Sequence, residues 1–261
     1  IYQMQIIYMI KYLMFLVVLI YRKNQLEKYV IYSKISMVQN KKILAIIPAR
    51  ANSKRINNKN IKKFCGKPLI HWTIDQAKNS SIIDRVIVST DSETIKEISI
   101  ASGAEVPFLR PKIFAQDHSS TNDCIIHLLD NLQENYDIII LLQPTSPLRK
   151  DFHIKEATEY FINHKNVESL VSVKKNTNRL NLENNLIYDL FDKNTLNLNE
   201  KNMPKSLSPN GSIYISTRIN FLKNKTFYTN KTYLYIMNDK HSVDIDYEKD
   251  FLYATKLFGK T

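Results

Sequence analysis

From Lys42 onward, short and continuous apolar runs alternate with longer amphipathic stretches, and this alternation constrains the fold more than any other feature. Continuous apolar runs of about four to eight residues are typical of strands that are buried on both faces. Such strands are expected at residues 43–47, 85–89, 137–142 and 169–173. The pattern predicts an α/β fold of βαβ units, with a mainly parallel central sheet covered by helices on both faces.

Several residues mark the expected ends of the intervening helices. Pro68 suits a first helical turn, because its fixed φ is compatible with a helix start. Asp91 or Ser92 is expected to cap a second helix, and Gly103 to end it. Another helix is expected to begin near Asp151. Ligands of such sheets bind beyond the carboxyl ends of the strands, so the loops after the first three strands are the expected place for a site.

Residues 174–209 interrupt the alternation, because they are rich in Asn and Lys and contain one hairpin-like piece at 186–191. Three interpretations stay open for this excursion: disorder, a lid, or an element that packs against another subunit. The alternation resumes with strands expected at 211–216 and 232–237 and a closing helix from about Tyr247. Residues 42–261 are therefore expected to form one main domain, with 174–209 as a dimerisation or lid excursion.

The first 41 residues form a separate extension. Residues 6–21 are apolar except for Lys11, and the basic pair Arg22 and Lys23 follows them. This run is shorter than the roughly 20 residues that cross a bilayer. Three interpretations stay open: translated sequence upstream of a true start at Met37, a signal anchor that keeps the following domain in the cytoplasm, or a partner-binding helix. A small-residue cleavage site, as in a secretory signal, is not evident.

The net charge of +12 suggests a nucleic-acid-binding protein, but its distribution argues against one. Residues 1–42 carry seven Lys or Arg and one Glu, so about half of the excess lies outside the main domain. Cys65 and Cys124 have no neighbours at metal-like spacing and cannot build a disulfide framework. We therefore expect no nucleic-acid partner and a reducing cytoplasm, with a membrane contact only if the apolar segment belongs to the protein.

The loop after the first strand carries the strongest site signal. Arg50, Lys54, Arg55 and Lys59 lie within ten residues of one another. Four positive charges on one loop repel each other unless an anion joins them, and a triphosphate supplies that anion. The loop contains no GxxxxGK[ST] motif, so it is not a Walker loop. A solvated basic turn is the alternative interpretation.

The same segment resembles the signature of the CMP-sugar synthetases, the acylneuraminate cytidylyltransferase family. That signature has the form PAR-x-x-S-K-x-x-x-x-K-N, followed by G-K-P-L. The matching residues here are Pro48, Ala49, Arg50, Ser53, Lys54, Lys59, Asn60, Gly66, Lys67, Pro68 and Leu69. Family members often carry glycines where this chain has Ala51 and Asn52. The resemblance implies a Rossmann-like, glycosyltransferase-A-like nucleotidyltransferase fold.

The resemblance also implies roles for the loop residues. Arg50, Lys54 and Lys59 would bind the β- and γ-phosphates of CTP, and Ser53 would contribute to nucleotide binding. Lys59 and Asn60 would stabilise charge as pyrophosphate leaves. Arg50, Lys59 and Asn60 are therefore expected to be catalytic as well as nucleotide-binding.

Further segments match in the family order and extend the resemblance over nearly all of residues 42–258. The family counterparts of Arg110 and Thr121 contact the cytosine. A surface ion pair is the alternative for Arg110. In LLQPTSPLR, residues 141–149, two prolines stiffen the turn after the strand. The resemblance places Gln143 on the sugar acid.

Three more residues are expected to bind the sugar acid. Thr145 and Ser146 lie on the same stiffened turn as Gln143, although both could instead be capping residues. Asn210 lies in PNGSIYI, residues 209–215. Ahead of this segment the family has arginines that bind the acceptor or reach phosphate across a dimer, whereas this chain has Glu200, Lys201 and Ser208, and keeps only Lys205 as a nearby cation.

A carboxylate pair near the C-terminus is the expected metal site. Asp244 and Asp246 are separated by one residue, so both side chains point to the same side of an extended segment. The pair repels itself unless a cation lies between, and hard oxygen ligands suit Mg²⁺, with Mn²⁺ as an alternative. The resemblance assigns the pair to a metal near the α-phosphate and makes Asp244 catalytic. Two caps of the closing helix are the alternative, and His241 is expected to be a surface residue.

Together these features predict an enzyme that transfers CMP from CTP to the anomeric hydroxyl of a sialic-acid-like nonulosonic acid and releases pyrophosphate. Such a product would serve the synthesis of cell-surface polysaccharide or glycan, and the resemblance implies a homodimer. Pseudaminate or 3-deoxy-octulosonate are alternative acceptors. A catalytically inactive nucleotide-binding protein is an alternative of another class, suggested by Glu200 and Ser208. A basic protein of membrane surfaces or nucleic acids is a third.

Overall fold

The computed structural model describes residues 41–51, 53–116, 119–176, 180–183, 186–189 and 206–259. The chain divides into two compact units, Ile1–Lys41 and Lys42–Thr261. Only Lys41 of the first unit is described, so the predictions for the N-terminal extension lie outside the described residues. In the part of the chain that is described, no helix has the length and apolar character needed to span a membrane.

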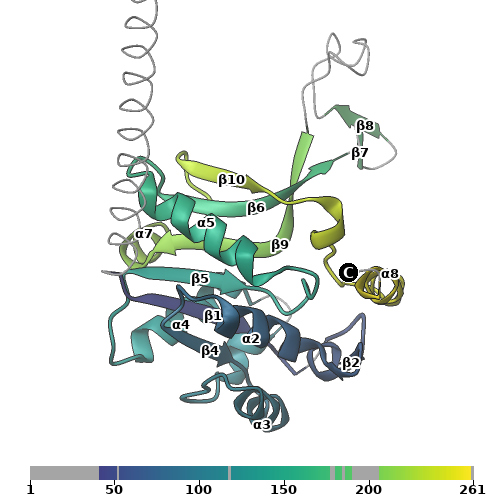
Figure 1. The fold of residues 1–261 in the computed structure, drawn as a ribbon, viewed down its shortest axis with the longest axis horizontal. Coiled ribbons are helices and arrows are strands. Elements are labelled where there is room, and N and C mark those ends of the chain that lie inside the picture. Colours follow the sequence, from purple (N-terminus) through teal and green to yellow (C-terminus); the bar gives the residue numbers. More distant parts are fainter. Residues whose placement is uncertain are drawn as a thin grey trace, which may run out of the picture. The chain divides into compact units, whose positions relative to one another are not determined.

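The central sheet has six strands in the order β10-β6-β9-β5-β1-β4 (Figure 1). Their bounds are Ile43–Pro48 for β1, Arg85–Ser89 for β4, Ile138–Leu142 for β5, Ser169–Asn176 for β6, Ser206–Thr217 for β9 and Thr232–Ile236 for β10. β1 lies parallel to both β4 and β5, and β10 lies parallel to β6. β9 runs antiparallel between β5 and β6. The predicted α/β fold with a mainly parallel sheet is confirmed.

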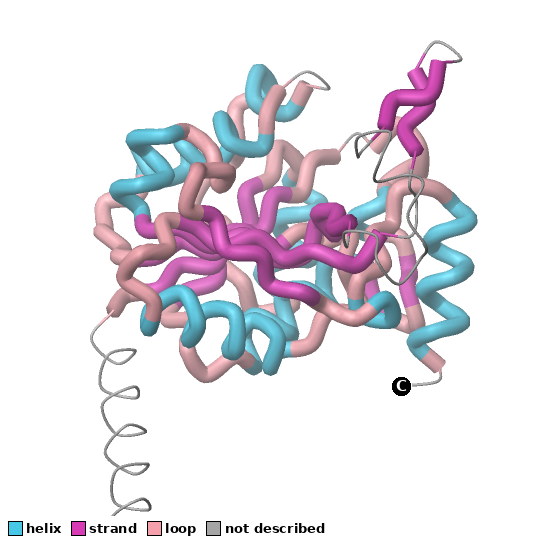
Figure 2. The backbone as a smooth tube through the Cα atoms, turned by 90° about the horizontal axis from the view of Figure 1, so that it is seen from above, coloured by secondary structure: helices cyan, strands magenta, loops and turns pink. Residues whose placement is uncertain are grey.

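Helices cover both faces of this sheet (Figure 2). They are α2 (Leu69–Asn79), α3 (Glu93–Ala101), α4 (Thr121–Asn131), α5 (Asp151–Asn163) and α7 (Arg218–Asn224). The remaining helix, α8 (Glu248–Phe258), packs apart from the two cores of the sheet. Within β1, Ile43, Ala45 and Ile47 pack on the face covered by α2, α3 and α5. Leu44 and Ile46 pack on the opposite face against α4 and α7. Because alternate residues enter two cores, both sides of the strand must be apolar, which explains its continuous apolar run.

The helix ends follow the predicted signals with one change. Ser92 is the N-cap of α3, and its hydroxyl accepts a hydrogen bond from the backbone N–H of Ile95 at 3.3 Å. Asp91, the other predicted cap, lies outside the helix and binds a different segment. Gly103 follows α3 with a φ of +89°, a conformation that favours glycine. Pro68 is the N-cap of α2, immediately before its first residue.

The excursion is shorter than the predicted 174–209, because Asn176 of β6 pairs with Ser206 of β9. The hairpin-like piece predicted at 186–191 contains only one strand of the hairpin: β8 (Leu186–Asp189) pairs antiparallel with β7 (Leu180–Glu183), so the hairpin begins before the predicted bounds. Its role as a lid or dimerisation element stays a prediction. β2 (Lys63–Phe64) and β3 (Lys67–Pro68) form another small antiparallel pair. A third apolar cluster joins α8 to the segment that contains this pair.

Candidate active site

A cavity of about 500 Å³ lies at the carboxyl ends of β1, β4 and β5. The parallel arrangement of these strands brings the loops that follow them to one edge of the sheet. Most of the predicted site residues line the cavity: Arg50, Ser53, Lys54, Lys59, Asn60, Arg110, Thr121, Gln143, Thr145 and Asp246. Ser146, Asn210 and Asp244 are not among its lining residues.

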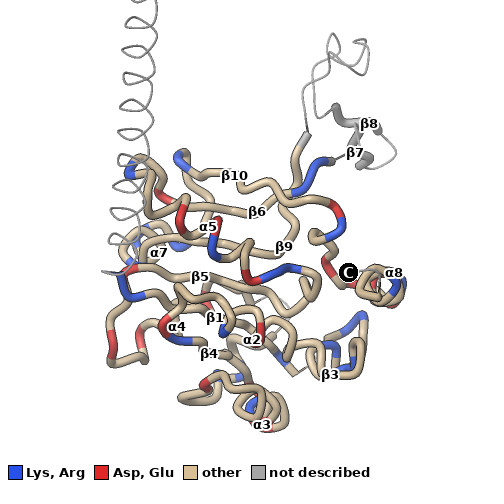
Figure 3. Tube along the Cα trace, viewed as in Figure 1, with Lys and Arg blue, Asp and Glu red and all other residues tan. Residues whose placement is uncertain are grey.

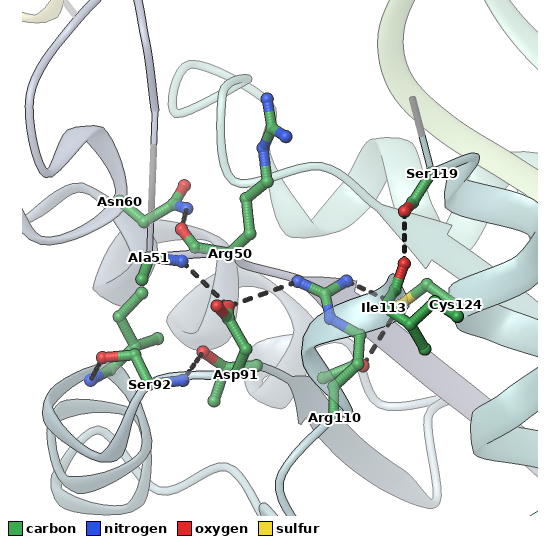
Figure 4. A network of polar contacts seen from close by, with 12 residues as sticks. Arg50, Ala51, Asn60, Asp91, Ser92, Arg110, Ile113, Ser119 and Cys124 are labelled. Carbon is green, nitrogen blue, oxygen red and sulfur yellow. Dashed lines mark hydrogen bonds and ion pairs between the residues drawn. The ribbon is translucent and has the colours of Figure 1, made fainter. Parts of the chain in front are cut away.

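The loop after β1 is fixed at two points of its backbone. The Asn60 side chain is almost fully buried and donates a hydrogen bond from Nδ2 to the carbonyl of Arg50 at 3.0 Å. The backbone N–H of Ala51 donates to Asp91 Oδ1 at 2.9 Å, which ties the loop to the end of β4. Figure 4 shows both contacts and the Arg50 side chain extending away from them. The loop is therefore fixed through its backbone, while the side chains of Arg50, Lys54 and Lys59 line the cavity.

Positive charge concentrates around this loop. From Arg50 to Lys67 the chain carries seven Lys or Arg and no Asp or Glu. Figure 3 shows the basic segments that gather around β3, close to α8. Part of the positive surplus of the chain therefore lies on the loop that lines the cavity and on the segment that follows it.

Asp246 meets two of these cations. Its Oδ1 lies 3.2 Å from Lys59 Nζ, and its Oδ2 lies 3.0 Å from Arg55 Nη1. Lys59 Nζ also donates to the carbonyl of Ile245 at 2.8 Å. Lys59 thus connects the loop after β1 to the segment before α8, across 186 residues of sequence. An anion in the cavity would share these cations with Asp246.

Arg110 is buried at the other end of the cavity, with 6% of its surface exposed. Its Nη1 donates to Cys124 Sγ at 2.8 Å, and its Nη2 lies 3.7 Å from Asp91 Oδ1 (Figure 4). Its Nε and Nη2 have no hydrogen-bond partner among the described residues. The alternative of a surface ion pair is wrong, because the guanidinium is buried and lines the cavity.

Asp244 and Asp246 flank Ile245, which packs together with Val243 in the third apolar cluster. Asp246 lines the cavity and Asp244 does not, so their orientation to one side stays a prediction. The segment is not a strand of the sheet, but the backbone N–H of Ile245 donates to the carbonyl of Thr145 at 2.8 Å. This bond brings Asp244 beside the turn after β5.

Burial raises the pKa of Asp244, and the nearby Asp246 raises it further. A hydrogen bond from Thr145 opposes this shift. Asp244 Oδ1 is buried and has no hydrogen-bond partner among the described residues. Thr145 Oγ1 also lies 3.5 Å from Gln143 Oε1. Gln143, Thr145 and Asp244 therefore form one polar group at the end of β5.

The described residues contain no group of three or more His, Cys, Asp or Glu side chains that could hold a metal ion. Two carboxylates with one unpartnered oxygen still fit Mg²⁺, which is usually bound by one or two carboxylates together with substrate phosphate. His241 is only half-buried, and its Nδ1 lies 2.7 Å from the carbonyl of Leu148, so this nitrogen belongs to a backbone contact.

Two residues expected to bind the sugar acid lie behind the cavity lining. Ser146 is fully buried, and its hydroxyl has no partner among the described residues. Asn210 Oδ1 accepts hydrogen bonds from Ser172 Oγ at 2.6 Å and from the N–H of Ser212 at 3.2 Å. Asn210 Nδ2 donates to Ser242 Oγ at 3.0 Å. The geometry gives Asn210 a structural role in β9, and its contact with a sugar acid stays a prediction.

Other lining residues were not predicted from the sequence. Phe114, Gln116, Ser119 and Ser120 border the cavity between β4 and α4. Ser120 caps α4, since its hydroxyl accepts from the N–H of Asp123 at 3.0 Å. A Ser followed three residues later by an acidic residue is a sequence signal for a helix start, so α4 could have been predicted.

The positions that lack the expected arginines are mostly outside the described residues. Glu200, Lys201 and Lys205 fall there, whereas Ser208 lies on β9 opposite Lys174 of β6.

Comparison with known proteins agrees with this arrangement. A family model described as cytidylyltransferase matches residues 44–258. A CMP-N,N'-diacetyllegionaminic acid synthase from Legionella pneumophila is 39% identical over 225 residues, which cover 83% of this chain and 96% of that protein. An N-acylneuraminate cytidylyltransferase from Streptococcus agalactiae is 36% identical over 82% of this chain, and the chain spans only 52% of that relative's length.

Among solved structures, a CMP:2-keto-3-deoxy-manno-octonic acid synthetase complexed with CTP has a TM-score of 0.64 at 16% identity. The match covers 84% of this chain and 99% of the other, and it shows a shared fold. The family model matches most of the chain, and the relatives are well above 30% identical, so the chain can be assigned to a family. The chain belongs to the cytidylyltransferase family.

Proposed function

We propose that the protein transfers CMP from CTP to the anomeric hydroxyl of a sialic-acid-like nonulosonic acid and releases pyrophosphate. The observation that carries this proposal is one cavity that joins a cationic loop, a buried arginine with unpartnered N–H groups and, at its edge, a carboxylate pair. The names of the Legionella and Streptococcus relatives support an acceptor of this class.

The triphosphate would lie on the loop after β1. Arg50, Lys54 and Lys59 line the same cavity and carry the charge that a triphosphate needs. Lys59 is paired with Asp246, so the phosphates of CTP would compete with that carboxylate for the ammonium group. This arrangement keeps the loop compact before CTP binds and provides charge for the pyrophosphate as it leaves.

The cytosine would lie against Arg110. The buried Nε and Nη2 N–H groups need acceptors, because an unsatisfied buried donor costs about 1–3 kcal/mol. The cytosine ring supplies such acceptors at its carbonyl oxygen and ring nitrogen. Asp91 holds both Ala51 of the phosphate loop and Arg110, so the base and phosphate subsites are fixed to the same carboxylate.

We propose Mg²⁺, or Mn²⁺ in its place, as the cofactor held by Asp244 and Asp246. When bound, the metal would neutralise charge on the reacting phosphate. Gln143 and Thr145 would orient the acceptor beside this pair, because both side chains line the cavity next to Asp244. Catalysis would then consist mainly of positioning and electrostatic stabilisation.

The direct test is pyrophosphate release by the purified full chain with CTP and Mg²⁺. N-acetylneuraminate, legionaminate, pseudaminate and 3-deoxy-octulosonate are offered separately, and we expect turnover with at least one of the first two. Turnover with only pseudaminate or 3-deoxy-octulosonate would establish the alternative acceptor. If the folded protein binds CTP but is silent with all four, the catalytically inactive nucleotide-binding protein is the better description.

We also propose a cytoplasmic homodimer, as the family resemblance implies. Light scattering of the purified chain tests the oligomeric state, because a dimer doubles the 30.6 kDa mass of one chain. A monomer that turns over CTP and an acceptor would separate the activity from dimerisation.

A further inference from the structure

Three segments meet behind the acceptor side of the cavity: the turn after β5, the first half of β9 and the segment before α8. Four hydrogen bonds join them: Arg149 Nη1 to the Ser212 carbonyl at 2.7 Å, His241 Nδ1 to the Leu148 carbonyl at 2.7 Å, the Ile245 N–H to the Thr145 carbonyl at 2.8 Å, and Asn210 Nδ2 to Ser242 Oγ at 3.0 Å. Two of these bonds involve β9: Arg149 donates to the carbonyl of Ser212 on β9, and Asn210, itself on β9, donates to Ser242.

β9 needs these side-chain bonds because its ladder is irregular here. The register with β6 shifts between Val171 and Val173, so one residue of β6, Ser172, faces a longer stretch of β9. Ser172 Oγ donates to Asn210 and accepts from the N–H of Ile213 at 2.7 Å. A bulge of this kind leaves backbone groups outside the regular pairing and re-aims the strand. The Ser212 carbonyl is one such group, and Arg149 is its donor.

The bulge carries Gly211, which has a φ of +71°. A Cβ atom on Gly211 would lie 2.9 Å from Gln143 Oε1 and 3.0 Å from Asp244 Oδ2. The backbone of β9 therefore approaches both site side chains as closely as a residue without a side chain permits. Ser212 is the next residue after Gly211, so fixing the Ser212 carbonyl also fixes where the Gly211 backbone meets Gln143 and Asp244.

Arg149 is fully buried, with 0% of its surface exposed. No carboxylate pairs with it among the described residues, and its Nε and Nη2 are without hydrogen-bond partners there. Burial lowers the pKa of Arg149 to about 9, so the guanidinium still carries its charge at neutral pH. A buried charge without a counter-ion is unfavourable, and an apolar side chain would avoid that cost. The hydrogen bond of the guanidinium to the Ser212 carbonyl is the contact that an apolar side chain could not make.

The groups packed around Arg149 add no compensating charge. His153 in the first turn of α5 is buried, and its pKa is lowered to about 4 by burial, with His241 and Arg149 as further causes. Ser146 and Ser212 contribute neutral hydroxyls, both without partners among the described residues. Lys150 is a further cation near His153. At neutral pH the residues around Arg149 therefore carry a net positive charge, and its buried part is the guanidinium of Arg149.

We propose that Arg149 is a positioning residue for the acceptor half of the reaction. By holding the Ser212 carbonyl, it fixes the bulge of β9 against Gln143 and Asp244. This role does not touch the loop after β1 or Arg110, and it reaches CTP only through the metal proposed at Asp244, so the KM for CTP should change far less than the acceptor KM. The kinetic part of the proposal rests on the proposed function, whereas the structural part does not.

The kinetic test compares Arg149→Met and Arg149→Lys in the full chain. We expect Arg149→Met to raise the acceptor KM at least about tenfold while the KM for CTP stays within about twofold. Arg149→Lys keeps a charge and a donor, so it should recover part of the loss. Equal rises in both KM values, or no change in either, would overturn the proposal. If Arg149→Met fails to fold, the Arg149→Lys variant must still show the split between acceptor and CTP.

A second measurement does not depend on turnover. Hydrogen–deuterium exchange should accelerate in peptides covering 143–149, 210–213 and 241–246 of the Arg149 variants, and stay unchanged in 50–61. Arg218→Met is the matched control, because Arg218 Nη2 also donates to a backbone carbonyl, that of Leu129, at 3.5 Å. It should leave all four regions as in the wild type.

The outcomes are separable. A wild type that is silent with every acceptor refutes the proposed function, and the exchange pattern then decides the role of Arg149 alone. Uniform acceleration across the chain, or none in the three peptides, would show that Arg149 is an ordinary core residue.

Discussion

The two sides of the cavity are built differently. The donor side, which is proposed to bind CTP, consists of Arg110 and the loop after β1, where Lys54 and Arg55 are exposed and Asn60 anchors the backbone. The acceptor side consists of buried groups in which Arg149 and Asn210 join segments far apart in sequence. The donor side works through charge, which tolerates some freedom of position. The acceptor side works through geometry, which a shift of one strand would disturb.

This difference fits the ligands that each side is proposed to take. A triphosphate is a large, strongly charged group, so several mobile cations can bind it. A sugar acid carries less charge and must present one hydroxyl to one phosphorus atom, so its neighbours must be rigid. Lys59 belongs to both sides, because it lies on the loop and binds Asp246 and the Ile245 carbonyl.

The largest effect is therefore expected at Lys59. Lys59→Ala removes a phosphate cation and the link between the two sides, so kcat/KM should fall on the order of 1,000-fold, as for the loss of one transition-state donor. Steady-state pyrophosphate release measures it. Lys62→Ala is the control, since Lys62 pairs with Glu248 on the exposed surface and should change kcat/KM less than about twofold. A loss below tenfold at Lys59 would mean that the two sides work without this link.

A smaller effect, confined to the donor side, is expected for Arg110→Lys. Lysine keeps the charge but loses the planar set of N–H groups that reaches Cys124 and faces the cavity. The KM for CTP should rise about 30-fold, while the acceptor KM changes little. Arg85→Lys is the matched control, because Arg85 binds Glu105 and Glu134 at the opposite end of β4. Equal rises in both KM values for Arg110→Lys would erase the distinction between the sides.

The same comparison explains what the sequence could predict. The strands and the loop after β1 are local: apolar runs, turn residues and four cations within ten residues of one another. The structure places most of the predicted site residues around one cavity for that reason. The contact of Asp91 with both Ala51 and Arg110 depends on which strands are neighbours, and no local pattern records it.

The acceptor side was less predictable for the same physical reason. Asn210 stands in a recognisable motif, yet its side chain is used within the bulge, which exists only when β6 and β9 pair. Arg149 follows two prolines in a stiff turn, and nothing in the sequence indicates that it is fully buried. Long-range packing decides both positions, whereas the excursion between β6 and β9 stays partly outside the described residues.

The smallest expected effect is a gain in stability on the acceptor side. The raised pKa of Asp244 means that its ionisation opposes folding: the stability contribution of the neutral acid is present below about pH 3.8 and is lost as the pH rises through the folded pKa. Asp244→Asn removes this loss, so at pH 7 without metal we expect the variant to be more stable than the wild type and to have a higher Tm. Calorimetry in EDTA measures both.

Asp250→Asn supplies the control of opposite sign to Asp244→Asn. Asp250 Oδ2 accepts hydrogen bonds from the N–H groups of Asp246 at 3.1 Å and Tyr247 at 2.8 Å, so it caps α8 and its replacement should lower Tm. The gain from Asp244→Asn must shrink toward zero well below pH 3.8, where the wild-type carboxyl is neutral in both the folded and the unfolded state. A gain that persists there would come from packing rather than charge. In that case ionisation of Asp244, the carboxylate proposed to hold the metal, would not destabilise the fold.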